Sequence, residues 1–358
     1  MGGSFYLAAL IGFVAATILL WGLRPVGQRI GLVDHPGGRK VHDHPTPLVG
    51  GIAMFVAFAF AILVLDSPLS GHRALFAGTL VLVVVGVLDD LHELSARARF
   101  GAQILASLIM SLGAGVVLHD LGHLLLAGQL VTLGMLSIPL TVFATVGVIN
   151  AVNMSDGIDG LAGSLVLVAL SALLLIAWPS GQREVIGLLL VLVAVVVAFL
   201  AFNLRPKGRA LVFMGDAGSM FLGFVLAWFL VRLSQGEARL FDPVTALWIF
   251  AMPLIDTVVM MVRRLRLGRS PFAADREHFH HILLAAGFTP KQTLGLVVLL
   301  ASGCAGIGLL GHFRGVPEHW MFWGFLALAG LHYWVVMRAW RVKRFLSRPL
   351  LQRADFGV

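Results

Sequence analysis

Residues 138–178 read IPLTVFATVGVINAVNMSDGIDGLAGSLVLVALSALLLIAW, a polar segment between two apolar runs. Within it, Asn150, Asn153, Asp156 and Asp159 recur at a spacing of three. An acidic side chain at the centre of a membrane helix costs about 2.5–3.5 kcal/mol, so such a cluster needs a reason. Carboxylate and amide oxygens are ligands that Mg²⁺ or Mn²⁺ takes. A short polar loop between two helices is the plain alternative, but the regular spacing favours a functional site.

The rest of the chain has the composition of a polytopic membrane protein. Of 358 residues, 59% are hydrophobic and only 12% are charged, which is outside the range of soluble domains. The first apolar run lacks a basic segment before it, so we expect a spanning helix rather than a cleaved signal. The single cysteine, Cys304, excludes a disulfide framework.

Apolar runs long enough to span a bilayer predict an all-α fold of about eleven transmembrane helices in one domain over residues 1–358. We place these runs at residues 4–23, 48–65, 74–88, 100–118, 135–152, 161–178, 185–203, 211–231, 243–262, 292–311 and 320–337. Pro139 and Pro253 lie inside or near runs and are candidates for kinks.

The basic residues alternate between the loops. One set of alternate loops, with the C-terminal tail, holds 21 of the 26 Lys and Arg residues. The positive-inside rule places that set in the cytoplasm, with the N-terminus outside and the C-terminus inside. This charge pattern explains the net charge of +8 without a nucleic-acid partner. The unusual polar clusters all fall on the cytoplasmic side, in loops 24–47, 89–99, 150–160, 204–219 and 263–291, so we expect one active site there.

Two of these clusters contain further acidic residues. Asp89 and Asp90 follow an apolar run, and adjacent helical residues point about 100° apart. We therefore expect different roles for the two, although both could simply end the helix at the interface. Asp216 begins another apolar run, where it could cap the helix. The adjacent Gly215 and Gly218 favour instead a backbone that approaches an anion or a metal.

The longest inner loop combines arginines with the histidines His278, His280 and His281. Arginine binds phosphate oxygens and imidazole donates hydrogen bonds or transfers protons, so this loop suits an anionic substrate. A zinc site lacks the usual partner ligands, and a basic loop near anionic lipid does not explain the histidines. Asp256, inside the ninth run, is a functional candidate or a helix-to-helix hydrogen bond.

Taken together, these clusters resemble the polyprenyl-phosphate N-acetylhexosamine-1-phosphate transferases along nearly the whole chain. The matching motifs are Leu88-Asp89-Asp90, residues 150–161 (NAVNMSDGIDGL), residues 213–219 (FMGDAGS) and residues 276–281 (REHFHH). The histidine spacing is similar to the WecA/TagO branch, with the peptidoglycan translocase branch as the alternative. The resemblance implies a bacterial inner-membrane enzyme that starts cell-surface polysaccharide synthesis.

The resemblance also implies the reaction and its residues. A UDP-N-acetylhexosamine, most simply UDP-GlcNAc, would pass its sugar 1-phosphate to undecaprenyl phosphate and release UMP. Asn153 and Asp216 would hold Mg²⁺, with Mn²⁺ as an alternative. Asp89, Asp90 and Asp156 are the expected catalytic residues. The expected substrate-binding residues are Lys40, His42, Asn150, Asp159, Gly215, Arg266, His278, His280 and His281.

Other readings stay open from the sequence. A secondary transporter fits many helices with acids, but the acids gather at one membrane face and no pair of interrupted helices stands out. A lipid-binding scaffold would not explain so many oxygen ligands. The sequence leaves open the sugar, the polysaccharide pathway, the separate roles of Asp89 and Asp90, and whether the protein is a homodimer, as homologues often are.

Overall fold

The structure is a computed structural model, and it describes residues 4–34, 45–65, 69–126, 128–205, 209–236, 239–268, 270 and 278–351. Within these ranges the fold is all-α, apart from an antiparallel pair of two-residue strands, β1 (Val33–Asp34) and β2 (Thr46–Pro47). The helices are α1 (Ser4–Ile30), α2 (Gly50–Ile62), α3 (Arg73–His92), α4 (Ala96–Leu108), α5 (Ser137–Ser155), α6 (Leu161–Ala177), α7 (Arg183–Asn203), α8 (Gly215–Arg232), α9 (Pro243–Ile249), α10 (Ala251–Arg266), α11 (Phe279–Ala285), α12 (Pro290–Phe313) and α13 (Glu318–Leu351).

The helices make this a multi-pass membrane protein, with fewer clear spans than the eleven expected. Among the described residues, eight helices are long and apolar enough to cross a membrane, or nine if α9 and α10 count as one broken span. Every predicted run overlaps at least one helix. However, α2 has only 13 residues, and α4 stops after 13 and continues as the π-helix Ile109–Gly113. The number eleven is therefore not confirmed.

The run at residues 243–262 is not one straight helix, and its bend lies close to Pro253, one of the two prolines named as candidates for kinks. The chain bends by 84° between α9 and α10. Phe250 lies at the break, and Pro253 lies in the first turn of α10. A proline lacks the N–H that the helix interior needs but costs little in the first turn, so the sequence tolerates a new helix start here and not a straight continuation.

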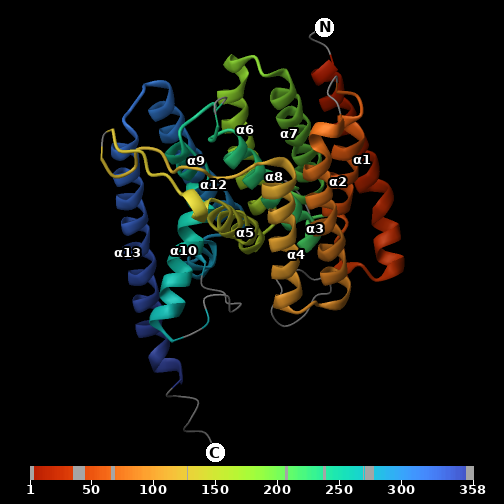
Figure 1. Cartoon of the computed structure of the whole chain (residues 1–358). Helices are drawn as coiled ribbons and strands as arrows, with labels where there is room; N and C mark the ends of the chain where they lie inside the picture. Colours follow the sequence, from red (N-terminus) through yellow and green to blue (C-terminus); the bar gives the residue numbers. More distant parts are fainter. Residues whose placement is uncertain are drawn as a thin grey trace, which may run out of the picture.

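Helix α8 is the centre of the bundle (Figure 1), packed against α2, α3, α5 and α6. In the membrane-span window of α8, 89% of the residues are buried inside the protein. Glycines allow this close packing at two positions in particular. A Cβ atom at Gly86 of α3 would lie 2.3 Å from the Ala217 Cα atom, and one at Gly223 would lie 2.6 Å from the Ile149 Cα atom of α5. Backbone therefore touches backbone where α8 meets its neighbours.

Two hydrophobic clusters make up the interior. The larger one includes the buried faces of α1, α2, α3, α7 and α8. The smaller one joins α9, α10, α12 and α13, together with Leu161 and Leu165 at the start of α6. Figure 1 shows these two groups of helices on opposite sides of the molecule, with α5 and α6 between them.

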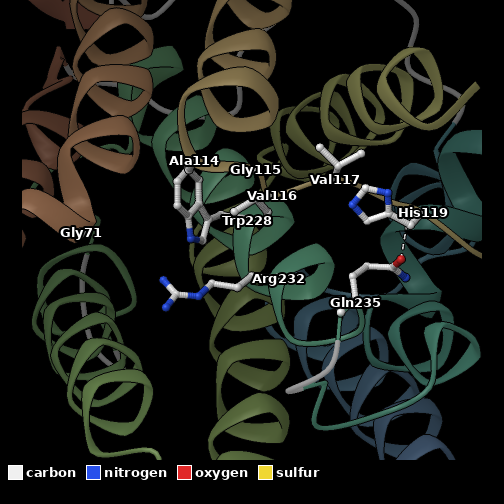
Figure 2. A pocket seen from close by; sticks show the side chains of 10 residues that line it. Gly71, Ala114, Gly115, Val116, Val117, His119, Trp228, Arg232 and Gln235 are labelled. Atoms are coloured by element: carbon white, nitrogen blue, oxygen red, sulfur yellow. Dashed lines mark hydrogen bonds between the residues drawn. The ribbon is translucent and has the colours of Figure 1, made fainter. Parts of the chain in front are cut away.

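A cavity of about 310 Å³ lies at the C-terminal end of α8 (Figure 2). Its lining includes Trp228, Arg232, His119 and Gln235, and the Gln235 Oε1 atom accepts a hydrogen bond of 2.8 Å from the His119 backbone N–H. Arg232 follows Asp216 by 16 positions in α8, so the cavity is about 24 Å along the helix from that acid at 1.5 Å per residue. It is therefore separate from the predicted site.

Candidate active site

The N-terminus of α8 is fixed by an acid from α3. The Asp90 Oδ1 atom accepts a hydrogen bond of 2.9 Å from the Asp216 backbone N–H, and Oδ2 accepts a longer one of 3.4 Å from Ala217. Gly215 has a φ of +70°, and a Cβ atom there would lie 2.5 Å from the Asp90 Oδ2 atom. A carboxylate at a helix N-terminus satisfies free N–H groups and the helix dipole. Asp90 therefore holds the backbone that carries Asp216.

Asp216 itself faces α5. The Asn153 Nδ2 atom donates a hydrogen bond of 2.5 Å to the Asp216 Oδ1 atom and one of 2.9 Å to the Ser219 hydroxyl. Asn153 lies in the last turn of α5, and Asp216 lies in the first turn of α8. The two side chains expected to share a metal ion are thus in direct contact, from segments 63 residues apart.

Asp89 has a different environment from its neighbour Asp90. Asp89 is buried, and its Oδ1 atom accepts a hydrogen bond of 2.6 Å from the Leu94 backbone N–H. Its Oδ2 atom lies 3.2 Å from the Arg99 Nη1 atom, and the same nitrogen lies 3.8 Å from the Asp216 Oδ2 atom. Arg99, from the first turn of α4, therefore bridges two carboxylates. We call Asp89, Arg99, Asn153 and Asp216 the polar cluster.

The polar cluster has the oxygen donors that a divalent cation needs. Among the described residues, no three His, Cys, Asp or Glu side chains are arranged as a metal site. Mg²⁺, however, is commonly held by one or two carboxylates together with water and substrate phosphates. Asp216 and Asp89 supply carboxylates here. Rotation of the Asn153 side-chain amide by half a turn would bring its Oδ1 atom toward the same position. The guanidinium of Arg99 already places positive charge between the two acids.

The segment 156–160 follows α5 and lies beside the histidine segment. A Cβ atom at Gly157 would come within 2.3 Å of the His280 Nε2 atom, so the imidazole packs directly on the backbone of this segment. Only 4% of His280 is exposed. Burial, and then the neighbouring His281, lower the pKa of His280 to about 3. His280 is therefore neutral at pH 7.

The pKa of Asp156 is raised. Removal of this carboxyl from bulk water by the surrounding protein is the first cause, and the charges of Asp216 and Asp159 add to it. Because loss of bulk water and nearby negative charge both disfavour the carboxylate, the pKa shift is toward the neutral acid. A cation bound nearby would lower the pKa again.

The C-terminal end of segment 156–160 is held by a hydrogen bond to Asn203. The Gly160 backbone N–H donates a hydrogen bond of 2.6 Å to the Asn203 Oδ1 atom, whose Nδ2 atom donates to the Val212 carbonyl at 3.0 Å. Asn203 thus ties the start of α6 to the segment that precedes α8. Asp159 lies just before this anchor and is exposed to solvent.

The remaining predicted residues occupy varied places. The Asn150 Nδ2 atom donates to the Gln103 Oε1 atom of α4 at 2.7 Å, so this amide contacts α4 and not Asp216. Arg266 is exposed and contacts the hydroxyl and the ring of Tyr333 in α13. His278 is the residue directly before α11, and its ring stacks on that of His280. Lys40 and His42 lie outside the described residues.

Four polar residues of this region were not predicted from the sequence. Arg99 was counted only as a topological charge, and Gln103, Asn203 and Ser219 were not singled out as site residues. A signal existed for the α4 pair. Arg99 and Gln103 are four residues apart and so share one helix face, and Ser107 extends that face by another turn.

Comparison with known proteins gives relatives along almost the whole chain. The chain is 40% identical over 338 residues to the undecaprenyl-phosphate alpha-N-acetylglucosaminyl 1-phosphate transferase of Yersinia pestis, covering 94% of this chain and 92% of the relative. The transferases of the same name from Escherichia coli K12 and Haemophilus influenzae are 39% and 40% identical, and they cover 94% and 96% of this chain and 92% and 97% of their own length.

The family model described as glycosyl transferase family 4 matches residues 72–234. That range contains Asp89, Asn153, Asp156 and Asp216 and ends before the histidine segment. The alignments with the relatives are longer than this range. On the identity and coverage of these relatives, the chain belongs to glycosyl transferase family 4.

Proposed function

We propose that this protein transfers N-acetylglucosamine 1-phosphate from UDP-GlcNAc to undecaprenyl phosphate. An oxygen of the lipid phosphate forms a bond to the β-phosphorus of the nucleotide sugar, the bond from that phosphorus to the bridging oxygen breaks, and UMP leaves with that oxygen. The contact of Asn153 with Asp216, inside the part of the chain that matches the family model, is the observation that carries this proposal. The activity for which the relatives are named agrees with it.

Both substrates are anionic, so the protein must position them and neutralise their charge. Asp216 and Asn153 would hold Mg²⁺ on the diphosphate, with Asp89 as the nearest further carboxylate; when bound, the ion would stabilise the negative charge that develops on the leaving phosphate. Arg99 places positive charge beside Asp89 and Asp216, where a divalent cation would compete with it. Asp156 and Asp159 would contact the nucleotide, and His280 would contact the sugar diphosphate through a neutral ring.

Asp89 and Asp90 have different roles in this proposal. Asp90 acts on the position of Asp216 through the backbone, since both its oxygens accept N–H groups of α8. Asp89 is the one of the pair whose carboxylate faces Arg99 and Asp216, so we assign it to the lipid phosphate or the ion. A phosphate monoester is mostly ionised near pH 7, so neither acid has to act as a strong base.

The orientation in the membrane follows from charge. The polar cluster lies where α3 and α5 end and α8 begins, and α10 ends with Arg263, Arg264 and Arg266. By the positive-inside rule this arginine-rich end faces the cytoplasm, where UDP-sugars are made. We therefore place the active site on the cytoplasmic face of a bacterial inner membrane, with the N-terminus outside.

The test is release of UMP by the purified protein with UDP-GlcNAc, undecaprenyl phosphate and Mg²⁺. Asp216→Ala and Asn153→Ala should abolish release, and Gly147→Ala should not, since a Cβ atom at Gly147 of α5 meets nothing within 4 Å. Removal of divalent metal with EDTA should stop the reaction, and Mg²⁺ or Mn²⁺ should restore it. Undiminished UMP release in EDTA would contradict the assigned chemistry.

A panel of UDP-sugars tests the substrate. UDP-GlcNAc should be used faster than UDP-GalNAc and than the UDP-MurNAc-pentapeptide of the peptidoglycan branch. A preference for the pentapeptide would move the protein to that branch. Uptake of a solute into proteoliposomes without UMP formation would instead support a transporter.

A further inference from the structure

Asp256 joins three segments at one carboxylate and has no role in the polar cluster. It lies in α10, five residues beyond the first residue of that helix, Ala251, and its side chain is 15% exposed. The Oδ2 atom lies 2.9 Å from the His278 Nδ1 atom, and the Oδ1 atom accepts a hydrogen bond of 3.0 Å from the Phe279 backbone N–H. His332 of α13 places its Nε2 atom 3.4 Å from Oδ1.

This geometry decides which nitrogen of His278 is available. An ionised carboxylate only accepts hydrogen bonds, so the Nδ1 atom of His278 carries the proton that Asp256 binds. The Nε2 atom is then the one ring nitrogen left for a substrate, as acceptor in the neutral ring and as donor in the charged ring. The hydrogen bond from the Phe279 N–H to Asp256 fixes the start of α11, and so it also fixes the backbone that carries the His278 ring.

Contacts connect His278 to the active-site segment 156–160. The rings of His278 and His280 are parallel within 8°, with centroids 6.0 Å apart. The His280 Nε2 atom in turn lies against Gly157, which directly follows Asp156. A line of contacts therefore runs from Asp256 through the two histidines to the segment that we expect to bind the nucleotide.

We propose that Asp256 is a positioning residue that fixes which nitrogen of His278 faces the nucleotide sugar. It acts through His278 and not by touching the substrate, and His332 holds the same carboxylate from the side of α13. This inference rests on the proposed function, because that function makes the histidines substrate ligands. A purely structural role, in which Asp256 only holds α10 against α11, is the alternative that the experiment must separate.

Asp256→Asn is the informative variant. The amide keeps the shape of the side chain, and its Oδ1 atom still accepts the Phe279 N–H. Its Nδ2 atom, however, donates to His278 Nδ1 and so moves the ring proton to Nε2, as in the Asp-to-Asn change of a serine-protease triad. We expect kcat for UMP release to fall about 100-fold, the effect typical of one misplaced polar group, while KM for UDP-GlcNAc changes less than about threefold.

Asp242→Asn is the matched control. Asp242 precedes α9 at the other end of the bent helix pair, its side chain is 46% exposed, and it pairs with Arg239 at 3.8 Å. The control should keep the kcat of the unchanged protein. An Asp256→Asn variant with kcat within threefold of the unchanged protein would overturn the proposal.

A double variant separates positioning from structure. If Asp256 acts through His278, then Asp256→Asn combined with His278→Gln should be no slower than His278→Gln alone. If the double variant is slower by the full factor of Asp256→Asn, Asp256 acts independently of His278 and the proposal fails.

Nitrogen NMR of ¹⁵N-histidine-labelled protein provides a readout that needs no turnover. The signal that is lost in His278→Gln should report a protonated Nδ1 atom, and in Asp256→Asn it should report a protonated Nε2 atom. The same tautomer in both proteins would refute the inference even if activity falls. Absence of UMP release by the unchanged protein would refute the proposed function, and the NMR comparison would still decide the role of Asp256.

Discussion

Gly86→Ala tests whether close contact of α3 with α8 sets the geometry of the active site. The new Cβ atom would lie 2.3 Å from the Ala217 Cα atom and 2.4 Å from the Ala217 nitrogen, whereas ordinary contact starts near 3.4 Å. The two helices must therefore separate by the difference of about 1.1 Å. Overpacking of this kind costs about 1–3 kcal/mol in the free energy of unfolding.

The displacement acts directly on the site. Ala217 follows Asp216, and Asp89 and Asp90 lie one turn beyond Gly86 on α3, so the change moves Asp216 away from both acids. A misplacement of 1 Å costs about 100-fold in rate, which is the loss of kcat that we expect. UMP release and thermal unfolding are the measurements, with Gly147→Ala as the control in open space. A Gly86→Ala variant with unchanged kcat and unchanged unfolding temperature would refute this reasoning.

Three further predictions concern single side chains near the site. Asp90→Ala removes the acceptors of two N–H groups at the start of α8. It should cost about 1–2 kcal/mol in the free energy of thermal unfolding, and Asp90→Asn should cost less. Equal stability of the unchanged protein and both variants would exclude the capping role. Arg99→Gln removes a positive charge that lies beside Asp89 and Asp216. The Mg²⁺ concentration for half-maximal UMP release should therefore fall about fivefold, which is ~1 kcal/mol. An unchanged Mg²⁺ concentration for half-maximal release would count against a metal site between these acids. His280 has a pKa lowered to about 3, so the unfolded chain binds the extra proton and stability falls as the pH drops from 6.5 toward 3, by at most about 1.4 kcal/mol per pH unit. His280→Asn should flatten this slope in unfolding measured at pH 7 and pH 5, and an identical slope would show that other groups cause it.

Part of this arrangement follows from the sequence because its physics is local. Apolar runs locate the helices, and the uneven distribution of arginine and lysine places the loops with Asp89, Asn153 and Asp216 on one side, where the structure brings these residues together. The break near Phe250 is different, since the residues around it are as apolar as those of a straight span. Pro253 marks a candidate kink there, but the 84° size of the bend depends on the packing of α9 and α10 against α12 and α13.

The contacts between helices could not be predicted in the same way. Asp90 looks like an ordinary acid at the end of α3, and its bonds to α8 join residues 126 and 127 positions apart. Arg99 looks like a loop charge until α4 is placed beside α3. The link from Asp256 to His278 spans 22 residues, part of which lies outside the described ranges. Such pairings depend on tertiary packing, which no local pattern encodes.

The enclosure of α8 has a consequence for how the bilayer acts on this protein. Lipid molecules contact mainly the outer helices, such as α1 and α13, of whose span windows only 22% and 17% are buried. Hydrophobic mismatch, which tilts and shifts helices when the hydrocarbon thickness changes, therefore acts on this outer ring. In nanodiscs of thinner or thicker lipids, capture of the prenyl acceptor should vary, while the distance between Asn153 and Asp216 stays constant.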